Sequence, residues 1–209
     1  MAKRSTTKSY SKYTFEDLKL LGLKTEIVEL FPAIEIQPVE PSAWLKETLE
    51  RGSSFSLNTE KAKSEFIIAP LLNEIYQNNS TVFSVYSGFN FNVDPERGLQ
   101  GFCDFLLAKL PLNVIPDTPI IAVVEAKLNE ALTAAVPQCA AEMYATRLWN
   151  EKRGETGQII YGVITTGNVW QFLRLQDGMT IEVDKKEYSL SQLALLLGVW
   201  QHIINDFRN

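Results

Sequence analysis

A run of five apolar residues that ends in two opposite charges constrains this chain more than any other feature. Residues 120–124 read Ile-Ile-Ala-Val-Val, and Glu125, Ala126 and Lys127 follow directly. An unbroken apolar run of this length predicts a strand buried on both faces. Side chains alternate along a strand, so Glu125 and Lys127 face the same side. Burying charge there is costly unless the groups pair or bind an ion. The segment is therefore either a strand-end salt bridge or a site for a metal ion and water.

A second acid is embedded in the preceding predicted strand, residues 101–109. Asp104 is surrounded there by apolar residues. If the two strands are antiparallel neighbours, Asp104 lies beside Glu125, and two close carboxylates repel each other strongly without a cation. Oxygen ligands from Asp104, Glu125 and the backbone carbonyl of Ala126 favour Mg²⁺ or Mn²⁺ over Zn²⁺. Asp117, which follows Pro116, is the alternative acid, but this stretch reads as a turn.

The surrounding pattern predicts a mixed α/β fold whose central sheet is covered by helices on both faces. Apolar spacing predicts helices over residues 14–21, 41–50, 58–76, 129–150 and 190–207, with Pro70 bending the third. Further strands are expected over 81–86 and 89–93, joined by a turn at Ser87-Gly88, over 158–165 and 169–175, and at an edge over 180–183. Residues 27–39 read as an extended cover segment. We expect a basic tail and helical extension over 1–57, a core over 58–175, and a C-terminal strand and helix over 176–209.

The charged residues occur in an order that resembles the PD-(D/E)XK nuclease superfamily, above all the nuclease domain of type I restriction motor subunits. The order is a helix glutamate, Gly-x-x-Asp on a strand, Glu-x-Lys after an apolar strand, and a glutamine on the next helix. The resemblance implies a restriction endonuclease-like fold and Mg²⁺-dependent hydrolysis of DNA. It implies that Asp104 and Glu125 bind the metal and that Lys127 orients or helps to deprotonate the attacking water. It also implies that Glu65 supports the metal shell and that Gln138 steers water or phosphate.

Two positions depart from the family pattern. Cys103 precedes Asp104 where the family motif has proline, and Glu142 follows Gln138 by four residues where one branch has tyrosine. A retained nuclease fold without catalysis, serving to bind nucleic acid or protein, is therefore the alternative function. A plain α/β domain with a strand-end ion pair is a third reading.

The charge balance limits how such a protein meets DNA. The net charge is −5, and the first 12 residues form a basic tail, expected to be flexible, whose removal leaves 16 basic against 25 acidic residues. Contact with a polyanion must therefore be local. The candidates for nucleic-acid binding are Arg147, Lys152 and Arg153, and a protein partner or a second copy is expected to assist.

Several chemistries and locations are excluded by composition. One histidine, His202, is too few for a His-rich zinc site, and we expect Cys103 and Cys139 to be small buried hydrophobes. The apolar runs are shorter than a membrane span, and no apolar segment follows the basic N-terminus. We therefore expect a cytoplasmic protein without a membrane partner.

Overall fold

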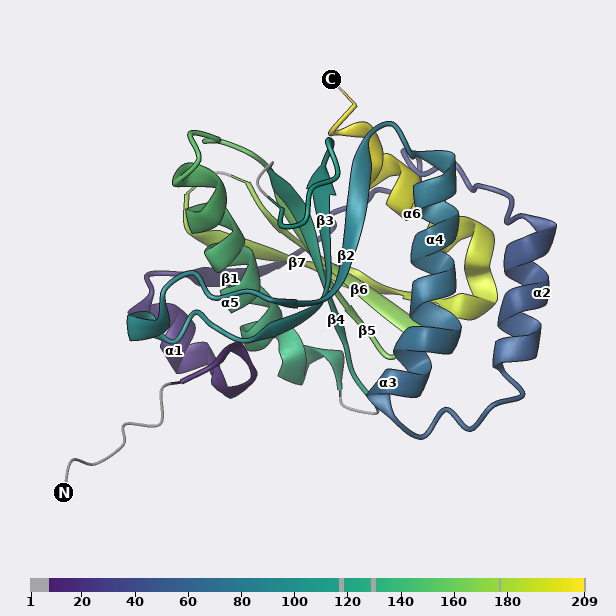
Figure 1. Cartoon of the computed structure of the whole chain (residues 1–209), viewed down its shortest axis with the longest axis horizontal. Coiled ribbons are helices and arrows are strands. Elements are labelled where there is room, and N and C mark those ends of the chain that lie inside the picture. Colours follow the sequence, from purple (N-terminus) through teal and green to yellow (C-terminus); the bar gives the residue numbers. More distant parts are fainter. Residues whose placement is uncertain (1–7, 117–118, 129–130, 177, 209) are drawn as a thin grey trace.

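A computed structural model of the chain describes residues 8–116, 119–128, 131–176 and 178–208 (Figure 1). Its centre is one sheet of seven strands in the order β1-β7-β6-β5-β4-β3-β2. Two neighbouring pairs, β1 with β7 and β4 with β5, are parallel, and the other four pairs are antiparallel. The strands are β1 (Lys24–Val28), β2 (Phe83–Asn90), β3 (Phe102–Lys109), β4 (Ile120–Ala126), β5 (Ile160–Thr165), β6 (Val169–Leu175) and β7 (Thr180–Ser189).

Helices cover both faces of this sheet, as the sequence predicts. Figure 1 shows α2, α4 and α6 on one side, and α1 and α5 on the other. Each layer closes its own apolar cluster against the sheet. The helices are α1 (Phe15–Leu20), α2 (Ala43–Gly52), α3 (Glu60–Lys63), α4 (Ala69–Asn78), α5 (Leu132–Glu151) and α6 (Leu193–Asn205). Within the described ranges, no helix is long and apolar enough to cross a bilayer.

Local sequence signals explain several of the helix boundaries. Thr14 and Asp17 form a reciprocal capping box at the start of α1. Between α3 and α4 the chain continues through a π-helical turn, Ser64–Ile68, which ends just before Pro70. Proline removes an N–H from the helical ladder, and a π turn is one way to accommodate this. The predicted helix over 58–76 is therefore confirmed, with its irregularity next to the proline.

Three local predictions are wrong. The segments 81–86 and 89–93 do not form a hairpin, because β2 runs straight through Gly88, whose φ of +62° leaves the strand unbroken. The strand at 180–183 is not at the edge, since β7 extends to Ser189 and lies between β1 and β6. Residues 8–12 are not a loose tail: Tyr10 is buried, and its hydroxyl donates to the Phe91 carbonyl over 2.8 Å. By contrast, residues 27–39 leave the edge strand β1 after Val28 and place Leu30, Phe31 and Ile36 in the apolar cluster, as expected of a cover segment.

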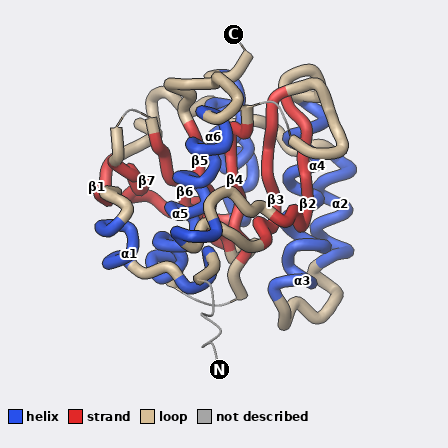
Figure 2. Tube along the Cα trace, turned by 60° about the vertical axis from the view of Figure 1, so that its left-hand side comes forward, coloured by secondary structure: helices blue, strands red, loops and turns tan. Residues whose placement is uncertain are grey.

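Strands from the N-terminal part (β1) and from the C-terminal part (β7) therefore join the same sheet as the strands between them. β1 forms one edge and β2 the other, at opposite sides of the molecule in Figure 2. Cys103 and Cys139 are both buried, as predicted, and so are Trp170 and Trp200.

Candidate functional site

Asp104 and Glu125 lie side by side at the end of the β3–β4 pair. The antiparallel register places Phe105 opposite Val124, and the next step along it brings Asp104 opposite Glu125. The backbone N–H of Ala126 donates to Asp104 Oδ2 over 2.8 Å, which fixes one carboxylate against the neighbouring strand. The sequence-based prediction that antiparallel pairing joins these two acids is therefore confirmed.

Lys127 connects this pair of acids to α5. Its Nζ donates to Glu125 Oε1 over 2.8 Å and to Gln138 Oε1 over 3.0 Å. The side chains of Lys127 and Glu125 are only 12% and 5% exposed, so the ion pair is shielded from bulk water. The strand-end salt bridge expected from the sequence is thus present, and Gln138 belongs to the same hydrogen-bonded group.

Glu142 is the residue of this group that sequence reasoning did not assign. It lies one turn beyond Gln138 on α5, is fully buried, and accepts a hydrogen bond from Gln138 Nε2 over 3.1 Å. The side chains of Glu125 and Glu142 also hydrogen-bond to each other when one of the two is protonated. When both are ionised, the buried Oε2 atom of each lacks a hydrogen-bond partner among the described residues. The sequence feature that could have indicated a role for Glu142 is its position as an acid on the apolar side of a helix, between Ala141 and Met143.

Burial shifts the protonation of all three acids in the same direction. Loss of hydration, reinforced by the charge of Asp104 and opposed by Lys127, raises the pKa of Glu125 to about 7. Burial and then the charge of Glu125 raise the pKa of Glu142 well above its usual range. Burial also raises the pKa of Asp104, against the effects of the Ala126 N–H and Lys127. The group therefore favours bound protons, or a cation in their place.

Asp104 lines a cleft of about 380 Å³ between α3 and the end of β2, whereas Glu125, Lys127 and Gln138 are not among the described residues that line it. Glu65 lines this cleft, but its carboxylate is half-exposed and paired with Lys61 one helical turn away. Glu60, which was not predicted, also lines the cleft, and its charge raises the pKa of Asp104. Glu60 is thus the helix acid that acts electrostatically on Asp104. The sequence feature that could have pointed to Glu60 is its position at the start of a helix, directly after the N-cap Thr59.

A divalent cation is compatible with the donors that are present. Asp104 and Glu125 supply carboxylate oxygens, the ligands that Mg²⁺ and Mn²⁺ prefer, and Glu125 Oε2 has no hydrogen-bond donor among the described residues when Glu125 and Glu142 are both ionised. In the described part of the chain, no three Asp, Glu, His or Cys side chains converge as a ready-made metal site. A cation held here would complete its coordination with backbone oxygens and water, as Mg²⁺ usually does.

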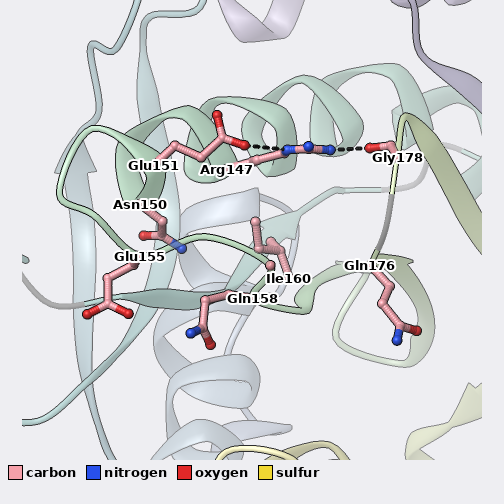
Figure 3. Close-up of a pocket in the computed structure, with 9 residues that line it drawn as sticks. Arg147, Asn150, Glu151, Glu155, Gln158, Ile160, Gln176 and Gly178 are labelled. Atoms are coloured by element: carbon pink, nitrogen blue, oxygen red, sulfur yellow. Dashed lines mark hydrogen bonds and ion pairs between the residues drawn. The ribbon is translucent and has the colours of Figure 1, made fainter.

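The three basic residues predicted to bind nucleic acid lie elsewhere, toward the C-terminal end of α5. Arg147 is nine residues beyond Gln138, or about 14 Å along the helix axis. It donates to Glu151 over 2.8 Å and to the Gly178 carbonyl, beside a small polar pocket of about 50 Å³ (Figure 3). Lys152 donates to the Val93 carbonyl, and Arg153 lies 3.5 Å from the ring centre of Trp149. Their contact with phosphate remains a prediction.

Comparison with known proteins adds no further assignment. No known protein family matches the chain, and no curated protein is detectably similar to it. Asp117, the alternative to Asp104 in the sequence, lies outside the described residues. The functional reading therefore depends on the geometry of Asp104, Glu125, Lys127 and Gln138.

Proposed function

We propose that this chain is a divalent-metal-dependent nuclease with a restriction endonuclease-like site that hydrolyses phosphodiester bonds in DNA. One observation carries the proposal. Asp104 and Glu125 are cross-strand neighbours, Lys127 contacts Glu125 directly, and Asp104 lines an open cleft. Two carboxylates and a lysine supply what metal-assisted hydrolysis needs, namely oxygen ligands for a cation and a group that can move a proton.

Each residue of the proposed site would have its own role in phosphodiester hydrolysis. Asp104, Glu125 and the carbonyl of Ala126 would hold Mg²⁺ or Mn²⁺, which neutralises phosphate charge and lowers the pKa of water. Lys127 would orient the attacking water and share its proton. Gln138 accepts a second hydrogen bond from Lys127 Nζ and so would position it. Glu60 and Glu65 line the cleft, from which they would support the shell of water around the cation.

The decisive experiment is incubation of the purified protein with supercoiled plasmid in Mg²⁺, in Mn²⁺ and in EDTA. We expect nicking or linearisation only with a divalent metal, and loss of activity by about 100-fold or more in Asp104→Asn and Lys127→Met. Lys185→Met is the matched control, because Lys185 pairs with Glu29 on the surface and contacts none of the site residues. Circular dichroism melting curves show whether each variant folds.

A second function, binding without catalysis, is favoured by one specific observation. Lys127 is held by two partners, Glu125 and Gln138, so the site is internally satisfied at its lysine. In that case wild-type protein binds DNA or a protein partner but leaves plasmid intact in every metal. Efficient metal-dependent cleavage by the wild type would exclude this alternative, and equal activity in Asp104→Asn and Lys127→Met would exclude the proposed site.

A further inference from the structure

We propose that the substrate is an unpaired DNA strand, and that one of its bases occupies an apolar groove continuous with the acidic cleft. This inference rests on the proposed nuclease function and specifies its substrate class. The groove lies between α4 and the edge strand β2 and has a volume of about 310 Å³. Volumes of roughly 300–1,000 Å³ are typical of sites for small organic groups.

The groove and the acidic cleft share part of their walls. Ala69, Ser87 and Phe105 line both of them. On the β2 side, the register that pairs Ser87 with Phe105 and Phe89 with Cys103 puts Gly88 opposite Asp104. A Cβ atom at Gly88 would meet nothing within 4 Å, so the passage beside Asp104 is open. A nucleotide whose phosphate lies at Asp104 can therefore extend its base into the groove.

The lining of the groove suits the face of a base. None of the described residues that line it is charged, and they include Tyr76, Leu72, Val85 and Leu112. Leu112 is 64% exposed, so its apolar surface lies in water until something covers it. Stacking of bases on aromatic and apolar side chains is the usual source of affinity for single strands, and it tolerates any sequence.

The charges around the cleft argue against an intact duplex. The cleft is lined by three acids, Glu60, Glu65 and Asp104, and by one cation, Lys61, which already pairs with Glu65. Affinity for duplex DNA comes mainly from neutralised phosphates, and the whole chain carries a net charge of −5. A paired base is also stacked inside the helix, where the groove cannot reach it. An unpaired strand provides contacts that do not depend on a basic surface.

The test measures binding of a short fluorescein-labelled oligonucleotide, as a single strand and as a duplex, by anisotropy in EDTA. We expect the wild type to prefer the single strand by about 10-fold or more, and Tyr76→Ala and Leu112→Glu each to weaken single-strand binding by about 10-fold. Val114→Glu is the matched control, because Val114 is 97% exposed on the same loop but does not line the groove. Leu112→Glu changes an exposed side chain, so it tests the groove even if Tyr76→Ala unfolds.

The outcomes separate this inference from the nuclease proposal. Equal affinity for strand and duplex, or variants that keep the wild-type preference, would overturn the groove assignment. Cleavage of an intact duplex as fast as the single strand in Mg²⁺ would also overturn it, while leaving the nuclease proposal in place. Strand-selective binding that Tyr76→Ala and Leu112→Glu abolish, without cleavage in Mg²⁺ or Mn²⁺, would support the groove and defeat the nuclease proposal.

Discussion

Glu125 couples the candidate site to the stability of the fold through its protonation. Burial raises its pKa from 4.5 to about 7, so in the folded protein the neutral acid is favoured over the carboxylate. The resulting stabilisation is complete below the unfolded-state pKa of 4.5 and is lost as the pH rises through about 7. At about 1.4 kcal/mol per pKa unit, the effect has an upper limit of roughly 3.5 kcal/mol.

We therefore predict that, in a chelator, the free energy of unfolding falls between about pH 5 and pH 7.5. The pKa values of Asp104 and Glu142 are shifted in the same direction, so they add to this trend. Urea denaturation across this range measures it. Glu125→Gln should flatten the profile, because the amide remains neutral throughout. A stability that rises with pH in wild-type protein would show that these acids are not desolvated as described.

Glu142 offers a second prediction at the same scale. Glu142→Gln keeps an oxygen that accepts from Gln138 Nε2, and its amide cannot ionise, so no charge can form there next to Glu125. We expect this variant to melt at or above the wild-type temperature at pH 8. Glu142→Ala leaves the Gln138 amide unpaired and opens a cavity, at a cost of about 1–3 kcal/mol. Melting curves of the two variants at pH 8 test whether Glu142 positions Gln138 through this hydrogen bond. Equal destabilisation by both variants would contradict that role.

Strand alternation explains which site residues could be predicted from sequence. Asp104, Glu125 and Lys127 follow from a period of two residues and one assumption of antiparallel pairing, and the register confirms that pairing. Glu60 and Glu142 could not be found in this way, because their distance from Asp104 and Glu125 depends on how two helices dock on the sheet. Helical periodicity shows which face is apolar but not which strand lies beneath each turn.

At the scale of elements, the docking of α5 on β5 requires a residue without a side chain. A Cβ atom at Gly162 would lie 2.8 Å from Cys139 Sγ and closer still to Met143, so the helix could not approach as it does. The same helix presents Gln138 and Glu142 to β4. Close packing of α5 against the sheet is therefore a condition for the hydrogen-bonded group at Lys127.

We predict that Gly162→Ala destabilises the protein by about 1–3 kcal/mol through overpacking. It should also lower nuclease activity, because α5 must move away from the sheet. Combining Gly162→Ala with Met143→Ala restores space, so the double variant should lose less than the two single variants together. Urea denaturation of the wild type, the two single variants and the double variant measures these losses. Strictly additive losses would show that the glycine does not govern the approach of the helix.

The same scale shows where sequence patterns mislead. Ser87-Gly88 has the composition of a turn, yet β2 continues through it, since Ser87 and Phe89 pair with β3 on either side of Gly88, whose φ is positive. Likewise, residues 180–183 read as an edge strand, but β1 pairs with β7 from the other end of the chain. Such non-local pairings carry no local signal. The layered α/β arrangement was predictable, since it depends only on which segments are apolar and at what period.

At the scale of the whole molecule, the acidic balance sets how binding responds to salt. Release of counterions makes the logarithm of single-strand affinity fall with the logarithm of salt concentration, by roughly 0.7 for each phosphate neutralised. The sequence offers three candidate contacts, Arg147, Lys152 and Arg153, and each already has an intramolecular partner. The number of neutralised phosphates is therefore small.

We predict a slope no steeper than about −2 for a labelled single strand, which corresponds to a loss of about 20-fold or less between 50 and 200 mM salt. Anisotropy titrations at four salt concentrations measure the slope. Replacing Arg147, Lys152 and Arg153 together with Gln should bring it close to zero if these residues contact phosphate, and Lys185→Gln is the control for lost surface charge. A wild-type slope of about −5 would indicate a larger basic surface. In that case affinity would come from phosphates instead of bases, and the apolar groove beside Asp104 would lose its role in recognition.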